Sequence, residues 1–326
     1  MEAPEFKKKP SVAIALLKRN LNLILPAKEM TRIIGVKKTD QDTVEINLLN
    51  KQAANLGSNR SYTHSGSING STKTTQTFTT ITHDFAYSLK QADRDSVFTL
   101  AEQTQAQFLS GMIAIIGSLE TAMLTALNTN KSQVSNTPSL GDWDSSNFIY
   151  SVDQADKNVV FQRLKGFMGQ NYYPGMLDTI GDEGIKQWFE YLANQGGGNS
   201  SNLGFQLSNI SMVGSPEMSP VDNKEGWGYI APSGTIGLMD WIPEMNRTGF
   251  GNPYQNGGAY WSIPDPWGLG LTFAIHETSA GADNNSNDGE RQDININVQM
   301  SIDHSFIVPT FSTANLSSIY KYYLNA

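Results

Sequence analysis

The feature that most constrains this fold is a strict alternation of apolar and polar side chains between residues 294 and 302. The apolar positions are Ile294, Ile296, Val298, Met300 and Ile302, and every residue between them is Asn, Gln or Ser. A period of two is typical of a β-strand with one buried face and one face in water. The run therefore predicts a long, half-buried strand.

A second alternating run precedes the first. It opens with the segment Asp265-Pro266-Trp267-Gly268-Leu269-Gly270-Leu271 and continues with Phe273 and Ile275. An Asn/Asp-rich stretch separates the two runs, so the sequence predicts a long β-hairpin. Such a hairpin is longer than a small core needs and favours an extended subunit.

A long helix is expected from about residue 96 to residue 127, because no proline interrupts this stretch and Asp95 or Ser96 can cap it. Its apolar residues recur at spacings of three and four, which predicts one continuous buried stripe: Leu109, Met112, Ile116, Leu119, Met123 and Leu127. At about 1.5 Å per residue the helix is more than ~40 Å long, which suits a structural spine.

Residues 55–77 differ in composition from the rest of the chain. Sixteen of the 23 residues are Ser, Thr, Asn or Gly, and none is acidic. Such a segment buries too little apolar surface to order itself. Alternating runs at 43–51 and 81–89 flank it, so we expect an extended two-stranded loop.

The stretch from about 158 to 262 contains short elements separated by Gly and Pro. One helix is expected around Ile185 to Leu192, ending before Gly196. These patterns predict a compact mixed α/β unit between the long helix and the long hairpin. Segments 306–311 and 316–324 close the chain.

Composition excludes several classes of site. The chain of 326 residues has no cysteine, so neither disulfides nor thiolate metal sites are expected. The first residues lack the apolar core of a secretory signal, and the apolar run from Phe108 to Leu119 is too short to span a bilayer. We therefore expect a soluble cytoplasmic product with no membrane partner.

Charge is distributed unevenly. Residues 1–40 carry nine Lys or Arg against four Asp or Glu, a net charge of +5; since the whole chain carries −8, the remaining 286 residues carry −13. A basic arm on an acidic body suits docking onto a neighbouring copy or proximity to nucleic acid. The alternative is an ordinary solvated helix face.

No catalytic or cofactor motif is present: the sequence has no phosphate-binding loop, no dinucleotide fingerprint and no nucleophile elbow. The four histidines are isolated, and the Asp283 segment lacks the final Glu of a calcium loop. We expect no enzyme, no cofactor and no metal. A set of aromatic residues leaves a glycan-binding alternative open, against simple packing: Trp227, Tyr229, Trp241, Tyr254, Tyr260, Trp261 and Trp267.

The order of these parts resembles the layout of tailed-bacteriophage major capsid proteins with the Hong Kong 97-like fold. Local segments are also similar: Thr82-His83-Asp84-Phe85 through Asp93-Arg94 into Leu100-Ala101-Glu102-Gln103, then Ile116-Gly117-Ser118-Leu119-Glu120, Gly234-Thr235-Ile236-Gly237-Leu238, and 265–271. The resemblance covers about residues 40–311.

The resemblance implies an α+β fold in six parts. These are an N-terminal arm (1–40), an extended loop (41–90), a spine helix with the first part of a peripheral domain (91–157), an axial domain (158–262), the peripheral β-hairpin (263–311) and a C-terminal return to the axial domain (312–326). Contacts between subunits are then expected at seven residues: Lys8, Lys9, Arg60, Tyr62, His64, Lys73 and Trp267.

The function implied is a structural protein that self-assembles, as hexamers and pentamers, into the shell around the double-stranded DNA of a tailed phage. The implied location is the virion, assembled in the host cytoplasm. A separate scaffolding protein, a portal and auxiliary capsid proteins are the implied partners, with non-specific proximity to the packaged DNA. An encapsulin-like protein compartment is an alternative with the same fold.

Overall fold

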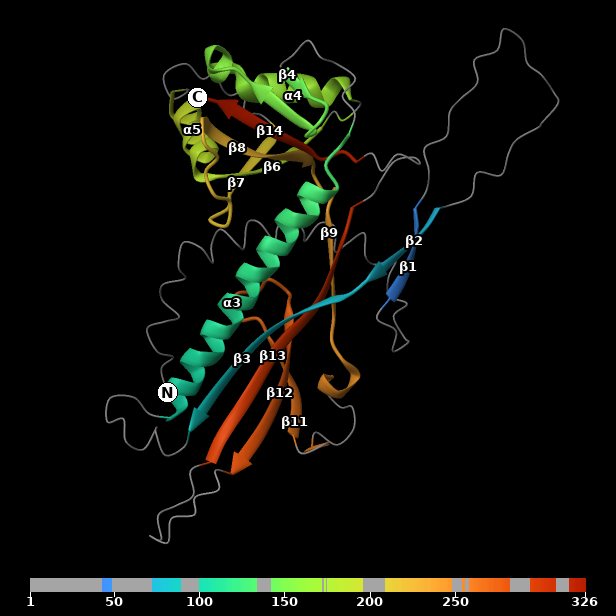
Figure 1. The fold of residues 1–326 in the computed structure, drawn as a ribbon, viewed down its shortest axis with the longest axis vertical. Coiled ribbons are helices and arrows are strands. Elements are labelled where there is room, and N and C mark those ends of the chain that lie inside the picture. The colour runs from blue at the N-terminus through green and yellow to red at the C-terminus, as the bar shows by residue number, and fades with distance from the viewer. Residues whose placement is uncertain are drawn as a thin grey trace, which may run out of the picture.

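The computed structural model describes residues 43–48, 72–88, 100–133, 142–171, 173, 175–195, 209–247, 254–255, 258–281, 294–308 and 317–326. These residues form an α+β fold with one long helix, two six-stranded sheets and a two-stranded ribbon (Figure 1). The long helix runs from the far end of one sheet to the other sheet. We call the two sheets the elongated sheet and the compact sheet.

The elongated sheet has the strand order β10-β11-β12-β13-β3, and β9 pairs with one end of β13. Its strands are β3 (Thr79–Ser88), β9 (Gly237–Trp241), β10 (Tyr254–Gln255), β11 (Gly258–Pro264), β12 (Thr272–Gly281) and β13 (Ile294–Ile307). A short 3-10 helix, η6 (Glu244–Asn246), follows β9.

The predicted long hairpin is confirmed as β12 and β13, which pair antiparallel from Ala274 opposite Ser301 to Gly281 opposite Ile294. The strand also has one buried and one exposed face, as predicted: Val298 and Met300 are buried, and Asn297 and Gln299 are exposed. Strand β13 continues past the hairpin to pair with β9, which makes it the central strut of this sheet.

The prediction was wrong about how the outgoing strand begins. Leu269 and Leu271 are buried in a turn, and β12 starts only at Thr272. The turn is organised by the buried carboxylate of Asp265, whose Oδ1 accepts the backbone N–H groups of Trp267 and Leu269, and whose Oδ2 accepts that of Leu271. Gly268 and Gly270 have φ values of 72° and 76°, in the left-handed region that favours glycine.

The predicted long helix is confirmed as α3 (Leu100–Thr129). It covers one face of the elongated sheet with a continuous buried stripe: Met112, Ile115, Ile116, Leu119, Met123 and Leu127. The helix lies close to β3 at Gly111, where an added Cβ would sit 2.9 Å from Cδ2 of His83. Glycine at this position therefore permits the close packing of helix and sheet.

Residues 104–129 of α3 are long and apolar enough to cross a membrane by length and composition alone, a wider span than the run from Phe108 to Leu119. The same test is passed by core helices of soluble proteins. In this fold Met112 and Leu119 pack against the elongated sheet, and the helix also carries a buried carboxylate, Glu120. These contacts are those of a core helix.

The compact sheet has the strand order β4-β5-β14-β8-β6-β7. Its strands are β4 (Asp142–Asp144), β5 (Ile149–Val152), β6 (Leu177–Gly181), β7 (Ile210–Gly214), β8 (Lys224–Pro232) and β14 (Tyr320–Asn325). Three helices accompany it: η4 (Gln154–Val159), α4 (Val160–Gln170) and α5 (Glu183–Gln195). The α5 range confirms the helix predicted around Ile185.

The two faces of the compact sheet belong to two different hydrophobic cores. On one face Tyr322 and Ile230 pack with α4 and α5, through residues such as Phe167 and Ile185. On the other face Tyr229 joins the core formed by α3 and the elongated sheet. The end of α3 is therefore built into both halves of the molecule.

The compact unit differs from the expected range of 158–262 at both ends. Strands β4 and β5, which precede residue 158, belong to the compact sheet, whereas β9, β10 and β11 pair within the elongated sheet. The C-terminal strand β14 lies in the middle of the compact sheet, between β5 and β8. Its parallel pairing with β5 joins residues about 170 positions apart, which short-range patterns do not reveal.

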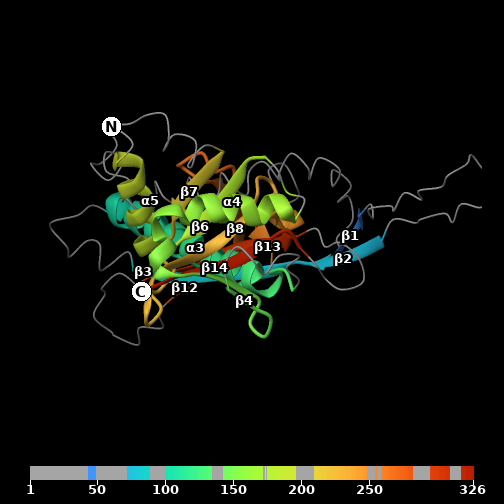
Figure 2. The ribbon, with the colours of Figure 1, turned by 90° about the horizontal axis from the view of Figure 1, so that it is seen from above.

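Strands β1 (Thr43–Leu48) and β2 (Thr72–Thr77) form the two-stranded ribbon. Only Phe78 separates β2 from β3, so the chain passes directly from the ribbon into the elongated sheet. Seen from above, the ribbon lies to one side of both sheets (Figure 2). Strands are present in both predicted runs, but they do not pair with each other. Strand β1 pairs with β2, which lies inside the segment expected to be too polar to order itself, and β3 pairs with β13 of the elongated sheet. Residues 49–71 lie outside the described residues.

Candidate functional site

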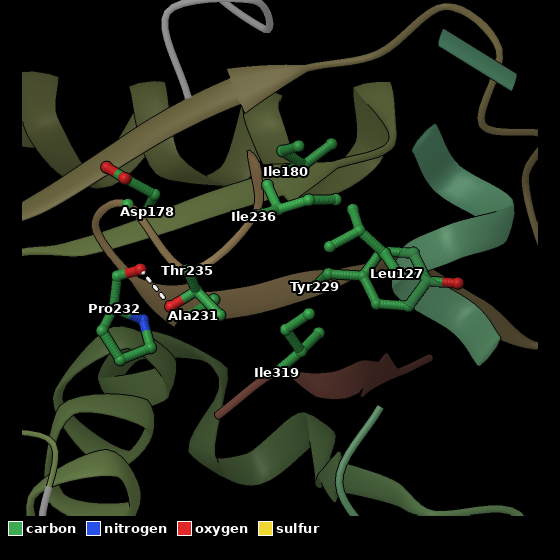
Figure 3. A pocket seen from close by; sticks show the side chains of 10 residues that line it. Leu127, Asp178, Ile180, Tyr229, Ala231, Pro232, Thr235, Ile236 and Ile319 are labelled. Atoms are coloured by element: carbon green, nitrogen blue, oxygen red, sulfur yellow. Dashed lines mark hydrogen bonds between the residues drawn. The ribbon is translucent and has the colours of Figure 1, made fainter. Parts of the chain in front are cut away.

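Within the described residues, no group of three or more His, Cys, Asp or Glu side chains is placed to hold a metal ion. A small cavity lies where the end of α3 meets β6 and β8 (Figure 3). Its volume is about 20 Å³, which is room for about one water molecule. It is too small for an organic substrate.

One carboxyl group, that of Asp178, lines this cavity among mainly apolar side chains. Burial raises the pKa of Asp178, and a hydrogen bond with Ser233 partly opposes the rise. The other lining side chains include Leu127, Ile180 and Ile319, none of which is a nucleophile or a base. Hydroxyl groups are present at Ser233, Thr235 and Tyr229, but the residues that line the cavity include no histidine, lysine or second carboxyl group to activate one of them.

The histidines of the described part lie in separate places. His276 is opposite Gln299, whereas His304 is opposite Thr79 and Asp240, five residues further along β13. Both lie in strands, as expected. Burial lowers the pKa of His304, which favours the neutral ring.

The aromatic residues that left the glycan-binding alternative open are divided between the two sheets. Trp227 and Tyr229 belong to β8 of the compact sheet, and Tyr260 and Trp261 belong to β11 of the elongated sheet. Trp261 contacts Phe108 of α3, at 5.6 Å between ring centroids. These contacts favour packing over a single sugar-binding surface.

An open groove of about 540 Å³ lies on the face of the elongated sheet opposite α3. Asp84, Gln299 and His276 line it from three neighbouring strands, and the register places them in one row. The His276 ring stacks on Tyr260 at 4.4 Å. The groove is open and lined by both polar and apolar residues, so it suits contact with an extended chain better than enclosure of a ligand.

The joint between α3 and the compact sheet is held by polar contacts as well as by the shared core. The Ser215 hydroxyl donates to Oε1 of Glu120, and both residues are buried. Tyr229 donates to Oδ1 of Asn128 at 3.2 Å, and the backbone N–H of Ser132 donates to the carbonyl of Ile319 at 2.7 Å. Because these contacts join α3 and the residues just after it to three segments of the compact unit, the joint is expected to be stiff.

Of the seven residues expected at contacts between subunits, Trp267 is the one whose side chain the structure describes. It is half-buried and packs against the core of the elongated sheet, beside the turn organised by Asp265. Lys73 lies in β2, opposite Asn47 of β1. Lys8, Lys9, Arg60, Tyr62 and His64 lie outside the described residues.

Sequence reasoning missed a cluster on the compact sheet. Lys321 of β14 lies over three aromatic rings, with Nζ 4.5 Å from the ring centroid of Trp227, 5.3 Å from that of Tyr323 and 5.8 Å from that of Tyr229. The only signal in the sequence is a lysine inside the otherwise apolar run Tyr320 to Leu324. That signal does not identify Trp227, which lies about 95 residues away.

No family model matches this sequence, and no curated protein matches it. Among solved structures the chain is similar to one from Mycobacterium phage Che8, at a TM-score of 0.49 and 11% identity over 94% of this chain and 90% of that one. It is also similar to the capsid of the cyanophage P-SCSP1u, at a TM-score of 0.48 and 10% identity over 88% and 84% of the two chains. A third similar structure is the capsid of Ralstonia phage GP4, at a TM-score of 0.44 and 8% identity over 90% and 86%.

Proposed function

We propose that this chain is a shell-building protein with the Hong Kong 97-like fold, the major capsid protein that encloses the double-stranded DNA of a tailed phage. The observation that carries the proposal is the ribbon β1-β2, which continues from the elongated sheet and pairs with no other strand in the described part of the chain.

An isolated two-stranded ribbon is marginally stable in water. Between its strands lies the segment 49–71, most of which has the polar composition that buries too little surface to order itself. A ribbon of this kind gains stability by lying on another surface, and a second copy of the chain is the partner always present at high local concentration. Its ordering is then coupled to assembly.

The rest of the fold suits a rigid, elongated subunit of a shell. Helix α3 is about 45 Å long at the usual rise per residue, and it lies along the elongated sheet (Figure 1). The helix then enters the core of the compact sheet. One rigid element therefore connects two parts that each offer separate surfaces to neighbours.

The chemistry of the described residues also favours a structural role. Their small cavity has room for about one water, and no histidine, lysine or second carboxyl group accompanies Asp178 among the residues that line it. The acidic balance of residues 41–326 suits a wall next to packaged DNA, because tight phosphate binding needs Lys and Arg to release counterions.

The domain roles follow from this proposal. We assign the ribbon and the residues between its strands to the extended loop, and α3 with the elongated sheet to the peripheral domain. The compact sheet with α4 and α5 is assigned to the axial domain, and residues 1–40 to the N-terminal arm. Hexamers and pentamers, a separate scaffolding protein, a portal and auxiliary proteins are the proposed partners.

The test is sedimentation velocity of the purified chain, alone and co-expressed with the scaffolding protein. We expect rings of five or six subunits, or closed shells, sedimenting far ahead of the single subunit. A chain that remains a single subunit under both conditions, at all concentrations tested, contradicts the proposal.

A further inference from the structure

The cluster around Lys321 occupies the face of the compact sheet that is turned toward α3. Successive rows across β14 and β8 place Lys321 opposite Tyr229, Tyr323 opposite Trp227, and Asn325 opposite Lys224. The intervening residues of β14, such as Tyr322, point to the other face and are buried with α4 and α5.

The three lysines of this face are held by rings and amides. In addition to the contacts of Lys321, Nζ of Lys224 lies 5.4 Å from the Tyr323 ring and donates to Oδ1 of Asn325 at 2.6 Å. Lys131, just after α3, donates to Oδ1 of Asn128 at 3.4 Å. We call Lys131, Lys224, Lys321, Trp227 and Tyr323 the basic aromatic face.

None of the three lysines of this face forms a salt bridge within the described part of the chain. Two carboxylates near this face accept hydrogen bonds from neutral groups, and one of them, Asp144, also interacts with Lys131 through its charge. Asp144 accepts hydrogen bonds from Ser146 and Asn147 in the β4-β5 turn, and Asp153 accepts one from Asn325.

The pKa values of two of these lysines agree with a face to which no carboxylate is bound. Burial lowers the pKa of Lys321 to about 8, and the neighbouring Lys131 adds to the effect. Burial also lowers the pKa of Lys131, with Asp144 opposing it. Tyr323 and Tyr229 stay neutral in this range because burial raises the pKa of each. Asp142 of β4 and Asp178 of β6 are further ionisable groups on this side of the sheet.

We propose that the basic aromatic face binds carboxylates on a second copy of this chain, and that the counterpart is the outer surface of α5 with Glu190 and Tyr191. The inference rests on the proposed function, in which copies lie side by side in rings. Glu190 is exposed, and Tyr191 is 47% exposed although it is a large apolar side chain.

The position of α5 fits this role because it covers the opposite face of the compact sheet. A contact between two opposite sides of the same unit is head-to-tail, and such contacts close into rings when the rotation between copies permits. Exposed aromatic side chains next to charge are typical of the anchor residues of protein interfaces.

Charge and geometry favour a second copy over nucleic acid. Residues 41–326 carry a net charge of −13, so every other copy presents an excess of carboxylates. The rings of Trp227 and Tyr323 are already covered by the lysine Nζ atoms, which leaves them unsuited to base stacking.

The contact should be linked to proton uptake. A carboxylate beside Lys321 favours its charged form, so the pKa of Lys321 is higher in the assembly than in the free subunit, where it is about 8. Assembly therefore takes up protons above pH 8, and the assembly equilibrium weakens as pH rises through 8 to 10.

The test compares Lys321→Gln with Lys165→Gln, a control with the same charge change on α4. Light scattering gives the critical concentration for assembly at pH 7 and pH 9.5, after thermal unfolding has confirmed that each variant is folded. We expect Lys321→Gln to raise the critical concentration at pH 7 by about tenfold or more, with little difference from wild type at pH 9.5. The Lys165→Gln control should have the same critical concentration as wild type at both pH values.

A charge exchange tests the counterpart. Lys321→Glu and Glu190→Lys should each impair assembly, and the double variant should recover most of it. Recovery supports α5 as the partner surface, and its absence overturns that assignment.

The outcomes separate this inference from the proposed function. If wild type assembles and Lys321→Gln does so with the same critical concentration and pH dependence, the interface is wrong while the shell function stands. If Lys321→Gln instead loses binding to a short DNA duplex with assembly unchanged, the face is a nucleic-acid surface and the proposal is overturned. If wild type forms no assembly at any pH, the proposed function fails, and this inference fails with it.

Discussion

The hydroxyl of Ser215 donates a hydrogen bond to the carboxylate of Glu120, and the two side chains join the compact sheet to α3 at a point where both are buried. A buried carboxylate needs such donors, because its desolvation is costly when a donor is removed. The contact therefore contributes to stability and helps to join α3 to the compact unit.

Replacing Ser215 with alanine is expected to lower the free energy of unfolding by about 1–3 kcal/mol, since the Glu120 carboxylate loses a donor. Chemical denaturation of the unassembled subunit measures this. Ser211→Ala is the matched control, because Ser211 lies on the same strand region and is exposed. Equal stability of the two variants would contradict the role of the contact.

Asp265→Ala should lower the free energy of unfolding by about 3 kcal/mol, because three backbone N–H groups lose their acceptor. Asp222→Ala, at an exposed aspartate, should change stability by less than about 0.5 kcal/mol. Urea midpoints of the two variants give the comparison. A small effect at Asp265 would mean that Gly268 and Gly270 hold the turn without the carboxylate.

Removing the hydroxyl group should change stability in opposite directions at two tyrosines of the compact sheet. The Tyr322 hydroxyl is buried without a hydrogen-bond partner among the described residues, so Tyr322→Phe should raise stability by about 1 kcal/mol. Tyr229→Phe loses the bond to Asn128 and should lower stability by about 1 kcal/mol. Melting temperatures that shift in the same direction would contradict this difference.

Acid sensitivity is expected from His304. Burial holds its pKa below the usual 6.5, despite a hydrogen bond to the backbone of Thr79 and the nearby Asp303. As pH falls below 6.5 the unfolded chain takes up a proton that the folded chain resists, so this residue's contribution to stability is present above 6.5 and is lost below it.

His304→Gln should remove this contribution, which makes the unfolding free energy of the variant fall less than that of wild type between pH 7 and pH 5. Denaturant titrations across that range measure the two slopes. The raised pKa values of Asp178 and Asp182 act in the opposite direction, but they are the same in both proteins. Identical slopes would contradict the assignment.

Deletion of residues 57–71 should leave the subunit folded and abolish assembly, since this segment is too polar to contribute to the subunit core. Replacement by a Gly/Ser linker of the same length serves as the matched variant, because it keeps the chain connection and removes the specific contacts. Far-UV circular dichroism reports on the fold, and sedimentation reports on assembly. Normal shells from the deletion variant would count against the loop.

Local patterns predicted the elements whose contacts are periodic along the chain. The alternation from Ile294 to Ile302 identified β13, and the apolar stripe from Leu109 to Leu127 identified α3, because in both cases the buried side chains recur with the period of the element. The outgoing strand was predicted to begin too early, because the sequence Leu-Gly-Leu at 269–271 also alternates. There a buried carboxylate and two left-handed glycines form a turn.

Which strands form the compact sheet, and in which order, could not be predicted in the same way. Strand β14 pairs with β5 and β8, which lie about 170 and 90 residues earlier. The cluster of Lys321 with Trp227 exists only through that pairing, so neither residue alone indicates it. Among the candidate contact residues, Trp267 was placed beside a buried turn, and the contacts proposed for the basic arm and the polar segment remain predictions.

Electron microscopy of the purified protein, alone and with a co-expressed scaffolding protein, tests the central proposal most directly. The proposal predicts closed shells in which the ribbon β1-β2 of each subunit lies across a neighbouring copy. A map that shows single subunits, or shells in which every ribbon contacts only its own subunit, would contradict it.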